Sequence, residues 1–140
     1  MPVRAAAGLT GVSCLAAGAD ALFAAAVLET GGRLVAVVPS RDYRQVKVAP
    51  GHADTYDRLV RAASEVLLLP YTTANRRAYE SANRTMPARA DRLLAVWDGS
   101  PPSGKGGGTA DTVQDARGAG IPVDVVWPDG AARRGRVTRS

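Results

Sequence analysis

Residues 93–99 of this chain read Leu-Leu-Ala-Val-Trp-Asp-Gly, and residues 106–109, after a loop rich in Pro, Ser and Gly, read Gly-Gly-Gly-Thr. An apolar run that ends in Asp and Gly is typical of a buried strand, and glycines followed by Thr are typical of a helix start. The first N–H groups of a helix have no intrahelical partner and carry the positive end of its dipole. Because parallel sheets bind ligands beyond the C-terminal ends of their strands, this stretch predicts a nucleotide- or phosphate-binding rim.

The same alternation of apolar and helical segments runs along the rest of the chain. We expect five strands, over residues 11–15, 33–38, 65–69, 92–97 and 122–127. We expect a helix that follows the turn at residues 16–20 and runs to Thr30, and further helices over residues 54–63, 73–89 and 109–119. Pro87 should kink or shorten the end of the helix over 73–89. We expect a polar loop over residues 40–53. Apolar strands that alternate with helices indicate a parallel sheet covered on both faces. The prediction is therefore an α/β fold, a Rossmann-like three-layer domain with a mainly parallel sheet of about five strands.

Charge is unevenly distributed along the 140 residues. The formal net charge is +5, and residues 131–140 hold four arginines and no acidic residue. We therefore expect one domain over residues 1–130 followed by a basic, disordered tail over 131–140. The near-neutral body argues against a nucleic-acid-binding face, except for weak contacts made by the tail.

Single cysteine and histidine residues exclude several classes of site. Cys14 is the only cysteine and His52 the only histidine. A single cysteine excludes a disulfide framework and a zinc cluster within one chain. A single histidine in a polar loop argues against a catalytic triad. The N-terminus lacks a signal peptide pattern, and no apolar run reaches the ~20 residues that span a bilayer. We expect a cytoplasmic protein with no membrane contact, no metal and no cofactor.

The glycine loop supplies the first set of candidate ligand contacts. Gly107 and Gly108 allow a close approach of the backbone to a ligand, and Thr109 can cap the helix or donate its hydroxyl to a phosphate. Asp98 and Gly99 end the preceding strand on the same rim. The alternative interpretation is a flexible loop before a capped helix. The position between a buried strand and a helix favours binding.

A second set follows the first predicted strand. Ser13, Gly18 and Asp20 lie in a turn of small residues that leads into a helix, which places more N–H donors on the same rim. Asp20 either stabilises the helix dipole or holds a ribose hydroxyl or a metal-bound water. The sequence does not distinguish between these roles of Asp20.

Basic and aromatic side chains supply the weaker candidates. Arg84, next to Asn83, either forks onto a phosphate or lies on a solvated helix face with Glu80. Trp97 and Trp127 both end predicted strands, where each either packs at the sheet edge or stacks on a base.

Four blocks of the chain resemble the SLOG superfamily, Rossmann-like proteins related to the Lonely Guy phosphoribohydrolases and to the DNA-processing protein of competence. Residues 11–20 (GVSCLAAGAD) are similar to its S-x-L-A-x-G-A-D segment, and residues 35–43 (VAVVPSRDY) to its next strand. Residues 90–99 (ADRLLAVWDG) and 107–110 (GGTA) are similar to its A-D-x-L-x-A-V-W-D-G and G-G-T-A signature. The resemblance covers residues 8–127.

The chain departs from that family in two places. The family begins with a further strand and helix ahead of residue 11, and the resemblance implies that this strand is central in the sheet. We therefore expect the 140-residue chain to be marginally stable or to self-associate as a homo-oligomer. The phosphoribohydrolases also carry a catalytic glutamate where this chain has Thr112. Hydrolase activity is thus disfavoured unless Asp111 or Asp115 replaces that carboxylate.

Three functions follow from these features, in decreasing order of support. The first is a binding protein, such as a sensor, for a nucleotide or nucleotide-derived ligand. The second is an enzyme that cleaves or transfers an N-glycosidic or phosphate bond of a nucleotide, with Asp98 or Asp20 as the carboxylate. The third is a binder of single-stranded DNA, against which the near-neutral body argues.

Overall fold

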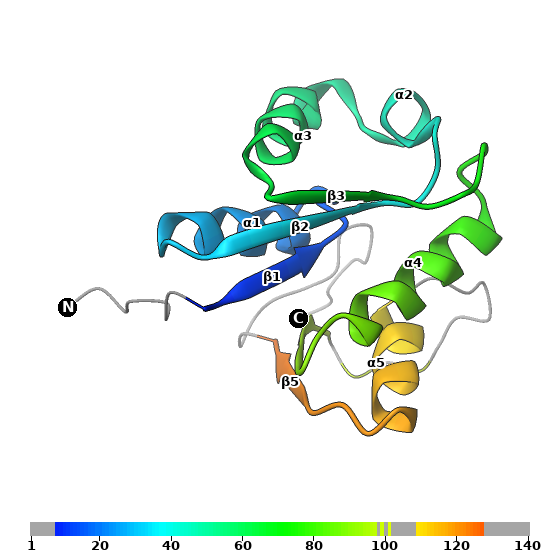
Figure 1. The fold of residues 1–140 in the computed structure, drawn as a ribbon. Helices are drawn as coiled ribbons and strands as arrows, with labels where there is room; N and C mark the ends of the chain where they lie inside the picture. The colour runs from blue at the N-terminus through cyan, green and yellow to red at the C-terminus, as the bar shows by residue number, and fades with distance from the viewer. Residues whose placement is uncertain (1–7, 98, 100, 102–108, 128–140) are drawn as a thin grey trace, which may run out of the picture.

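Strands and helices alternate through the described part of the chain, which in this computed structural model comprises residues 8–97, 99, 101 and 109–127 (Figure 1). The strands are β1 (Thr10–Ser13), β2 (Arg33–Val38), β3 (Glu65–Leu68), β4 (Leu93–Val96) and β5 (Val123–Val126). The helices are α1 (Ala19–Glu29), α2 (Tyr43–Lys47), α3 (Pro50–Ala62), α4 (Arg76–Ala88) and α5 (Thr109–Gly118). The mixed α/β class and the parallel strand pairing are confirmed.

The strands form two sheets, which corrects the expectation of a single sheet of about five strands. The first sheet has the order β1-β2-β3 and the second pairs β4 with β5, and every pair is parallel. Among the described residues, β1 pairs with no strand other than β2, and β4 with no strand other than β5. The physical reason for the division is that no strand lies between β1 and β4 in the described chain to join their free edges.

Strand β2 forms the centre of the core. Its residues Leu34, Val35, Ala36 and Val37 are all buried, because β2 has a strand on each side and helices on both faces. Helices α1 and α3 pack against each other, with α1 on β1 and β2, while α4 reaches β2 from the other side (Figure 1). The second sheet is covered by α5, which also contacts α4.

Close packing of α1 on the first sheet explains two small residues. A Cβ atom on Gly11 would lie 2.7 Å from Val27 Cγ2 and 3.0 Å from Phe23 Cε2, both on α1. One on Gly32, which follows α1, would lie 2.9 Å from Val27 Cγ1. The glycines therefore set how closely the helix approaches the strands.

The expected loop over residues 40–53 contains helix instead. Helix α2 covers Tyr43–Lys47, and α3 begins at Pro50. The N–H group of the first residue of a helix has no intrahelical partner, so a proline loses no hydrogen bond there. Pro50 therefore favours a helix start at this position. Pro87 lies inside α4, which ends one residue later, at Ala88.

Asp42 connects the loops that follow β2 and β3. Its Oδ1 accepts a hydrogen bond from Ser40 Oγ (2.8 Å) and another from the backbone N–H of Ala74 (2.7 Å). The N–H of Asp42 in turn donates to the carbonyl of Thr72. These bonds hold the entry to α4 against the first sheet and so position α4 beside the cavity described next.

Candidate functional site

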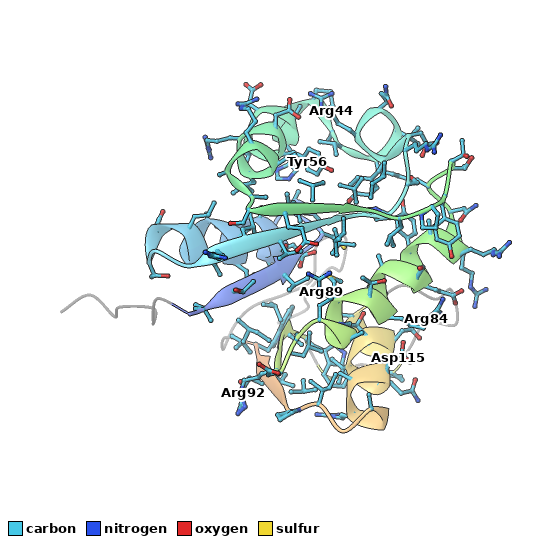
Figure 2. All side chains as sticks on the ribbon, viewed as in Figure 1. Arg44, Tyr56, Arg84, Arg89, Arg92 and Asp115 are labelled. Atoms are coloured by element: carbon cyan, nitrogen blue, oxygen red, sulfur yellow. The ribbon has the colours of Figure 1, made fainter. Side chains whose placement is uncertain are left out.

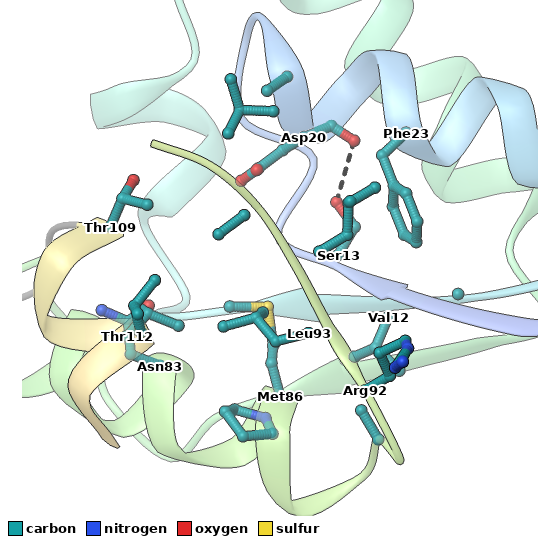
Figure 3. Close-up of a pocket in the computed structure, with 18 of the residues that line it drawn as sticks. Val12, Ser13, Asp20, Phe23, Asn83, Met86, Arg92, Leu93, Thr109 and Thr112 are labelled. Carbon is teal, nitrogen blue, oxygen red and sulfur yellow. Dashed lines mark hydrogen bonds between the residues drawn. The ribbon is translucent and has the colours of Figure 1, made fainter. Parts of the chain in front are cut away.

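A cavity of about 270 Å³ lies between the free edges of β1 and β4. Its walls come from both strands, from the starts of α1 and α5, and from one side of α4 (Figure 3). In Figure 3, Asp20 and Thr109 lie toward one end of the cavity and Arg92 toward the other. The end with Asp20 and Thr109 is the predicted rim, because β1 and β4 both run toward it.

The loop from β1 to α1 is held by hydrogen bonds within the protein. Ser13 is buried, and its hydroxyl donates to the carbonyl of Asp20 (3.1 Å) and accepts from the N–H of Leu15 (3.0 Å). Leu15 is buried with a φ of 61°, a left-handed conformation that is strained for leucine. His52 Nε2 lies 2.9 Å from the carbonyl of Leu15 and donates to it. Ser13 therefore shapes the rim, and its hydroxyl already has protein partners.

Asp20, in the first turn of α1, is one of the residues that line the cavity. It retains contact with solvent, yet the atoms around it displace enough water to raise the pKa of the carboxyl above its ordinary value. The nearby thiol of Cys14 lies 3.6 Å from Met86 Sδ. Burial, and secondarily the charge of Asp20, raise the pKa of Cys14 to about 12. Cys14 is therefore a protonated, unreactive thiol at neutral pH.

Helix α4 contributes a buried amide to the cavity wall. Asn83 lines the cavity, and its Nδ2 is buried with no hydrogen-bond partner among the described residues. A buried N–H donor without a partner is unfavourable, and native proteins usually supply one. This donor is therefore available for an acceptor atom of a ligand.

Helix α5 closes the opposite side of the cavity. Thr109 is its first residue and is exposed, whereas Thr112 and Val113 are buried one turn further on. All three line the cavity, as does Asn83 of α4 (Figure 3). The resemblance placed Thr112 at the position of a catalytic carboxylate, and the structure puts that position in the cavity wall.

The cavity brings together three of the predicted site residues, Ser13, Asp20 and Thr109. Gly18 and Gly99 lie outside its lining, and their φ angles of 94° and 85° explain why glycine occupies both positions. Arg84 also lies outside the lining, exposed on α4 (Figure 2). Asp98, Gly107 and Gly108 lie outside the described residues.

The residues that α4 contributes to the cavity wall are not the one that its charge suggested. Arg84 is a candidate phosphate contact or a solvated side chain from the sequence, while the cavity is lined by Asn83 and Met86. The buried residues Ala78 and Ala82 mark the inner face of α4, and helical spacing places Asn83 and Met86 at the border of that face. That helical periodicity was the sequence signal that could have indicated Asn83 and Met86.

Searches for other kinds of site within the described ranges gave two findings. No group of three or more His, Cys, Asp or Glu side chains there could hold a metal ion. None of the helices in those ranges combines the length and the apolar character needed to cross a membrane.

Comparison with models of known protein families gives no match for this chain, and comparison with curated proteins gives none either.

Proposed function

We propose that this chain binds a nucleotide or a related small phosphate ligand at the rim of the cavity between β1 and β4, within a Rossmann-like domain of the SLOG type. Two βα units, β1–α1 and β4–α5, direct their helix N-termini at this one cavity. Helix N-termini bind anions through unpaired N–H groups and the helix dipole. The N–H groups of Ala19 and Asp20 make no hydrogen bond to the described residues.

The observation that carries this proposal is the buried Nδ2 of Asn83. It is a neutral donor in the cavity wall whose partner is missing among the described residues. A phosphate or base carbonyl oxygen supplies such an acceptor, and a bond to a charged phosphate contributes roughly 1.5–3 kcal/mol.

Titration with adenosine monophosphate, with guanosine, cytidine and uridine monophosphates in parallel, tests this proposal by calorimetry and thermal shift. Asn83→Leu removes the buried donor at similar volume, and we expect it to weaken binding about 10-fold to 100-fold. Arg84→Ala is the matched control on the same helix, and it should leave the affinity unchanged. Equal affinity in wild type and Asn83→Leu, or no binding of any of the four nucleotides, would contradict the proposal.

The raised pKa of Asp20 favours a second candidate, an enzyme in which this carboxyl group donates a proton to a nucleotide bond. A carboxylic acid near a ligand remains protonated to a higher pH when its pKa is raised, as general acid catalysis requires. Chromatography of the same four incubations for free base, ribose phosphate or inorganic phosphate tests it. A product whose formation is lost in Asp20→Asn supports the enzyme, while binding without a product supports the sensor.

A further inference from the structure

The loop between β1 and α1 passes through a strained residue beside the cavity. Leu15 has a φ of 61°, and among the described residues it is the one residue other than glycine with a positive φ. This left-handed conformation is unfavourable for a residue with a Cβ atom and persists only where its surroundings hold it. The side chain of Leu15 is 1% exposed and belongs to the core together with Ala24 of α1 and Tyr56 of α3. Tertiary contacts therefore fix this conformation, because no local preference of leucine does.

Two side chains satisfy the backbone polar groups of Leu15. Its N–H donates to Ser13 Oγ (3.0 Å), and its carbonyl accepts from His52 Nε2 (2.9 Å). A carbonyl oxygen can only accept, so the imidazole nitrogen is the donor. Ser13 is two residues away along the chain, whereas His52 is 37 residues away, on α3. The bond from His52 therefore ties the loop to an element outside the β1–α1 unit.

The imidazole of His52 is held in place by the helix that carries it. His52 lies in the first turn of α3, and its backbone N–H donates to the carbonyl of Ala49. Its ring lies 6.4 Å from the ring of Tyr56, one turn further along α3, with an interplanar angle of 63°. Tyr56 is buried, and α3 packs against α1. His52 thus presents its donor from a position that the core determines.

The conformation of Leu15 determines where α1 begins. The carbonyl of Ala16, the next residue, accepts from the N–H of Ala21 in α1. Between them lie Ala19 and Asp20, which line the cavity and whose N–H groups make no hydrogen bond to the described residues. A rotation of Leu15 out of the left-handed region would move Ala16 and, through its bond to Ala21, the first turn of α1. The direction of these N–H groups therefore depends on the loop.

His52 lies outside the lining of the cavity, so it reaches the rim only through Leu15. Burial of the leucine side chain does not determine where the carbonyl of that residue points, whereas the hydrogen bond does. We propose that His52 is a positioning residue of the candidate site, whose hydrogen bond to the Leu15 carbonyl holds the strained loop that directs the first N–H groups of α1 into the cavity. Its effect on affinity rests on the proposed nucleotide site, but its effect on the loop is measured without a nucleotide.

Three substitutions at His52 separate its hydrogen bond from its bulk. The side-chain amide nitrogen of glutamine can take the place of Nε2, so His52→Gln keeps a donor. Phenylalanine keeps a ring beside Tyr56 but has no donor. The amide nitrogen of asparagine takes the place of Nδ1 and falls short of the Leu15 carbonyl. We therefore expect His52→Gln to behave as the wild type, and His52→Phe and His52→Asn to lose the bond.

Nuclear magnetic resonance of the full chain without a nucleotide reports on the loop directly. A positive φ brings the amide proton of a residue close to its own Hα, which gives Leu15 a strong intraresidue Overhauser cross-peak. This cross-peak should persist in His52→Gln and weaken several-fold in His52→Phe and His52→Asn. The amide signals of Ala19 and Asp20 should shift in the same two variants. Thermal unfolding establishes that each variant is folded.

Nucleotide titration then measures the effect on the site. The probe is the one of the four nucleoside monophosphates that binds the wild type most tightly. We expect His52→Gln to keep its affinity within about 2-fold, and His52→Phe and His52→Asn to weaken it about 10-fold, because misdirected N–H groups bind the phosphate less well. Recovery by glutamine and not by phenylalanine is the signature of the donor, because a role in packing alone would favour phenylalanine.

Two results would overturn the proposal. One is an unchanged Leu15 cross-peak in folded His52→Phe or His52→Asn, which would mean that side-chain burial alone holds the loop. The other is an equal change in His52→Gln and His52→Phe, which would mean that the imidazole acts through its packing.

Two further outcomes are decided by the same measurements. If neither donor-free variant folds, the wild type decides the question, because a hydrogen-bonded Nε2 proton of His52 exchanges slowly with water and fast exchange would exclude the bond. If no nucleotide binds the wild type, the proposed function fails. The Leu15 cross-peak and the Ala19 and Asp20 signals then decide whether His52 positions the loop.

Discussion

The two sheets of this protein use similar apolar strands with different results. Strand β2 reads Arg-Leu-Val-Ala-Val-Val and is buried from Leu34 to Val37, whereas β4 reads Leu-Leu-Ala-Val and buries only Ala95. Strand β5 exposes Val125 and Val126 as well. The composition of the strands does not explain this contrast, because both are aliphatic throughout their centres.

The contrast follows from the number of neighbours each strand has. Strand β2 has a strand on each side, α1 on one face and α4 on the other, whereas β4 has β5 on one side and α5 over it. Hydrophobic stabilisation scales with the apolar area removed from water, so the buried strand β2 contributes more of it than β4 does. The second sheet depends more on the elements packed around it.

The largest expected difference between the two halves is in thiol reactivity. Because the pKa of Cys14 is about 12 rather than 9.0, its thiolate fraction at pH 8 is about 1,000-fold lower than that of an ordinary thiol. The thiolate of higher pKa is also the stronger nucleophile, so iodoacetamide should alkylate native Cys14 at least about 30-fold more slowly than the thiol of a Val125→Cys variant in a Cys14→Ala background. Intact-mass spectrometry over time measures both rates. Similar rates would show that the first half is open to solvent.

The next contrast is between two leucines of equal size. Leu34 in β2 is fully buried, so Leu34→Ala should lower the free energy of unfolding by about 2–5 kcal/mol. Leu94 in β4 is 49% exposed, so Leu94→Ala should lower it by less than about 1.5 kcal/mol. Urea unfolding followed by circular dichroism gives both values. Equal losses would remove the distinction between the sheets.

Packing within the first half predicts a smaller effect at glycine. Gly11→Ala places a Cβ 2.7 Å from Val27 Cγ2 and should lower the free energy of unfolding by about 1–3 kcal/mol. Gly51→Ala is the control, because a Cβ there meets nothing within 4 Å and Gly51 lies inside α3. It should be neutral or stabilising by up to about 1 kcal/mol. A destabilising Gly51→Ala together with a neutral Gly11→Ala would refute this account of how α1 packs.

The smallest effect concerns the ion pair between β4 and β5. Arg92 Nε lies 3.0 Å from Asp124 Oδ2, and both side chains are more than half exposed. Arg92→Ala should therefore cost about 0.2–1 kcal/mol at low salt and almost nothing in 1 M NaCl. Urea unfolding of the wild type and the variant at both salt concentrations provides the check. A larger, salt-independent loss would mean that the second sheet relies on this pair.

Local sequence patterns predicted most of the elements. The expected strand over 33–38 matches β2, and the other four expected strands overlap observed ones. Helix α2 and the first turn of α3 were missed because the polar residues around Tyr43 resemble a loop. Burial of Tyr43 against Tyr56 stabilises that segment, with ring centroids 6.1 Å apart, and such a contact between distant residues has no local signal.

The number of sheets and the cavity could not be predicted from local sequence patterns either, because both depend on contacts between distant residues. Apolar alternation shows that β1 and β4 are strands, but their pairing depends on what lies beside them in space. The rim was predicted through Ser13, Asp20 and Thr109, because the ends of parallel strands gather helix N-termini. The Asn83 Nδ2 atom, which has no partner among the described residues, could be recognised only once the walls of the cavity were placed around it.

The parallel pairing also bears on the order in which the chain folds. Each ladder closes a long connection, from Thr10 to Arg33, from Val35 to Glu65 and from Leu93 to Val123. The entropic cost of closing a loop rises only with the logarithm of its length. The free-energy costs of these three closures therefore differ by only about a few tenths of a kcal/mol. Burial then decides the sequence of events, and we expect the β1-β2-β3 ladders to form first. They are also the first to leave the ribosome, so the first sheet is complete as a stretch of chain before β4 and β5 are synthesised.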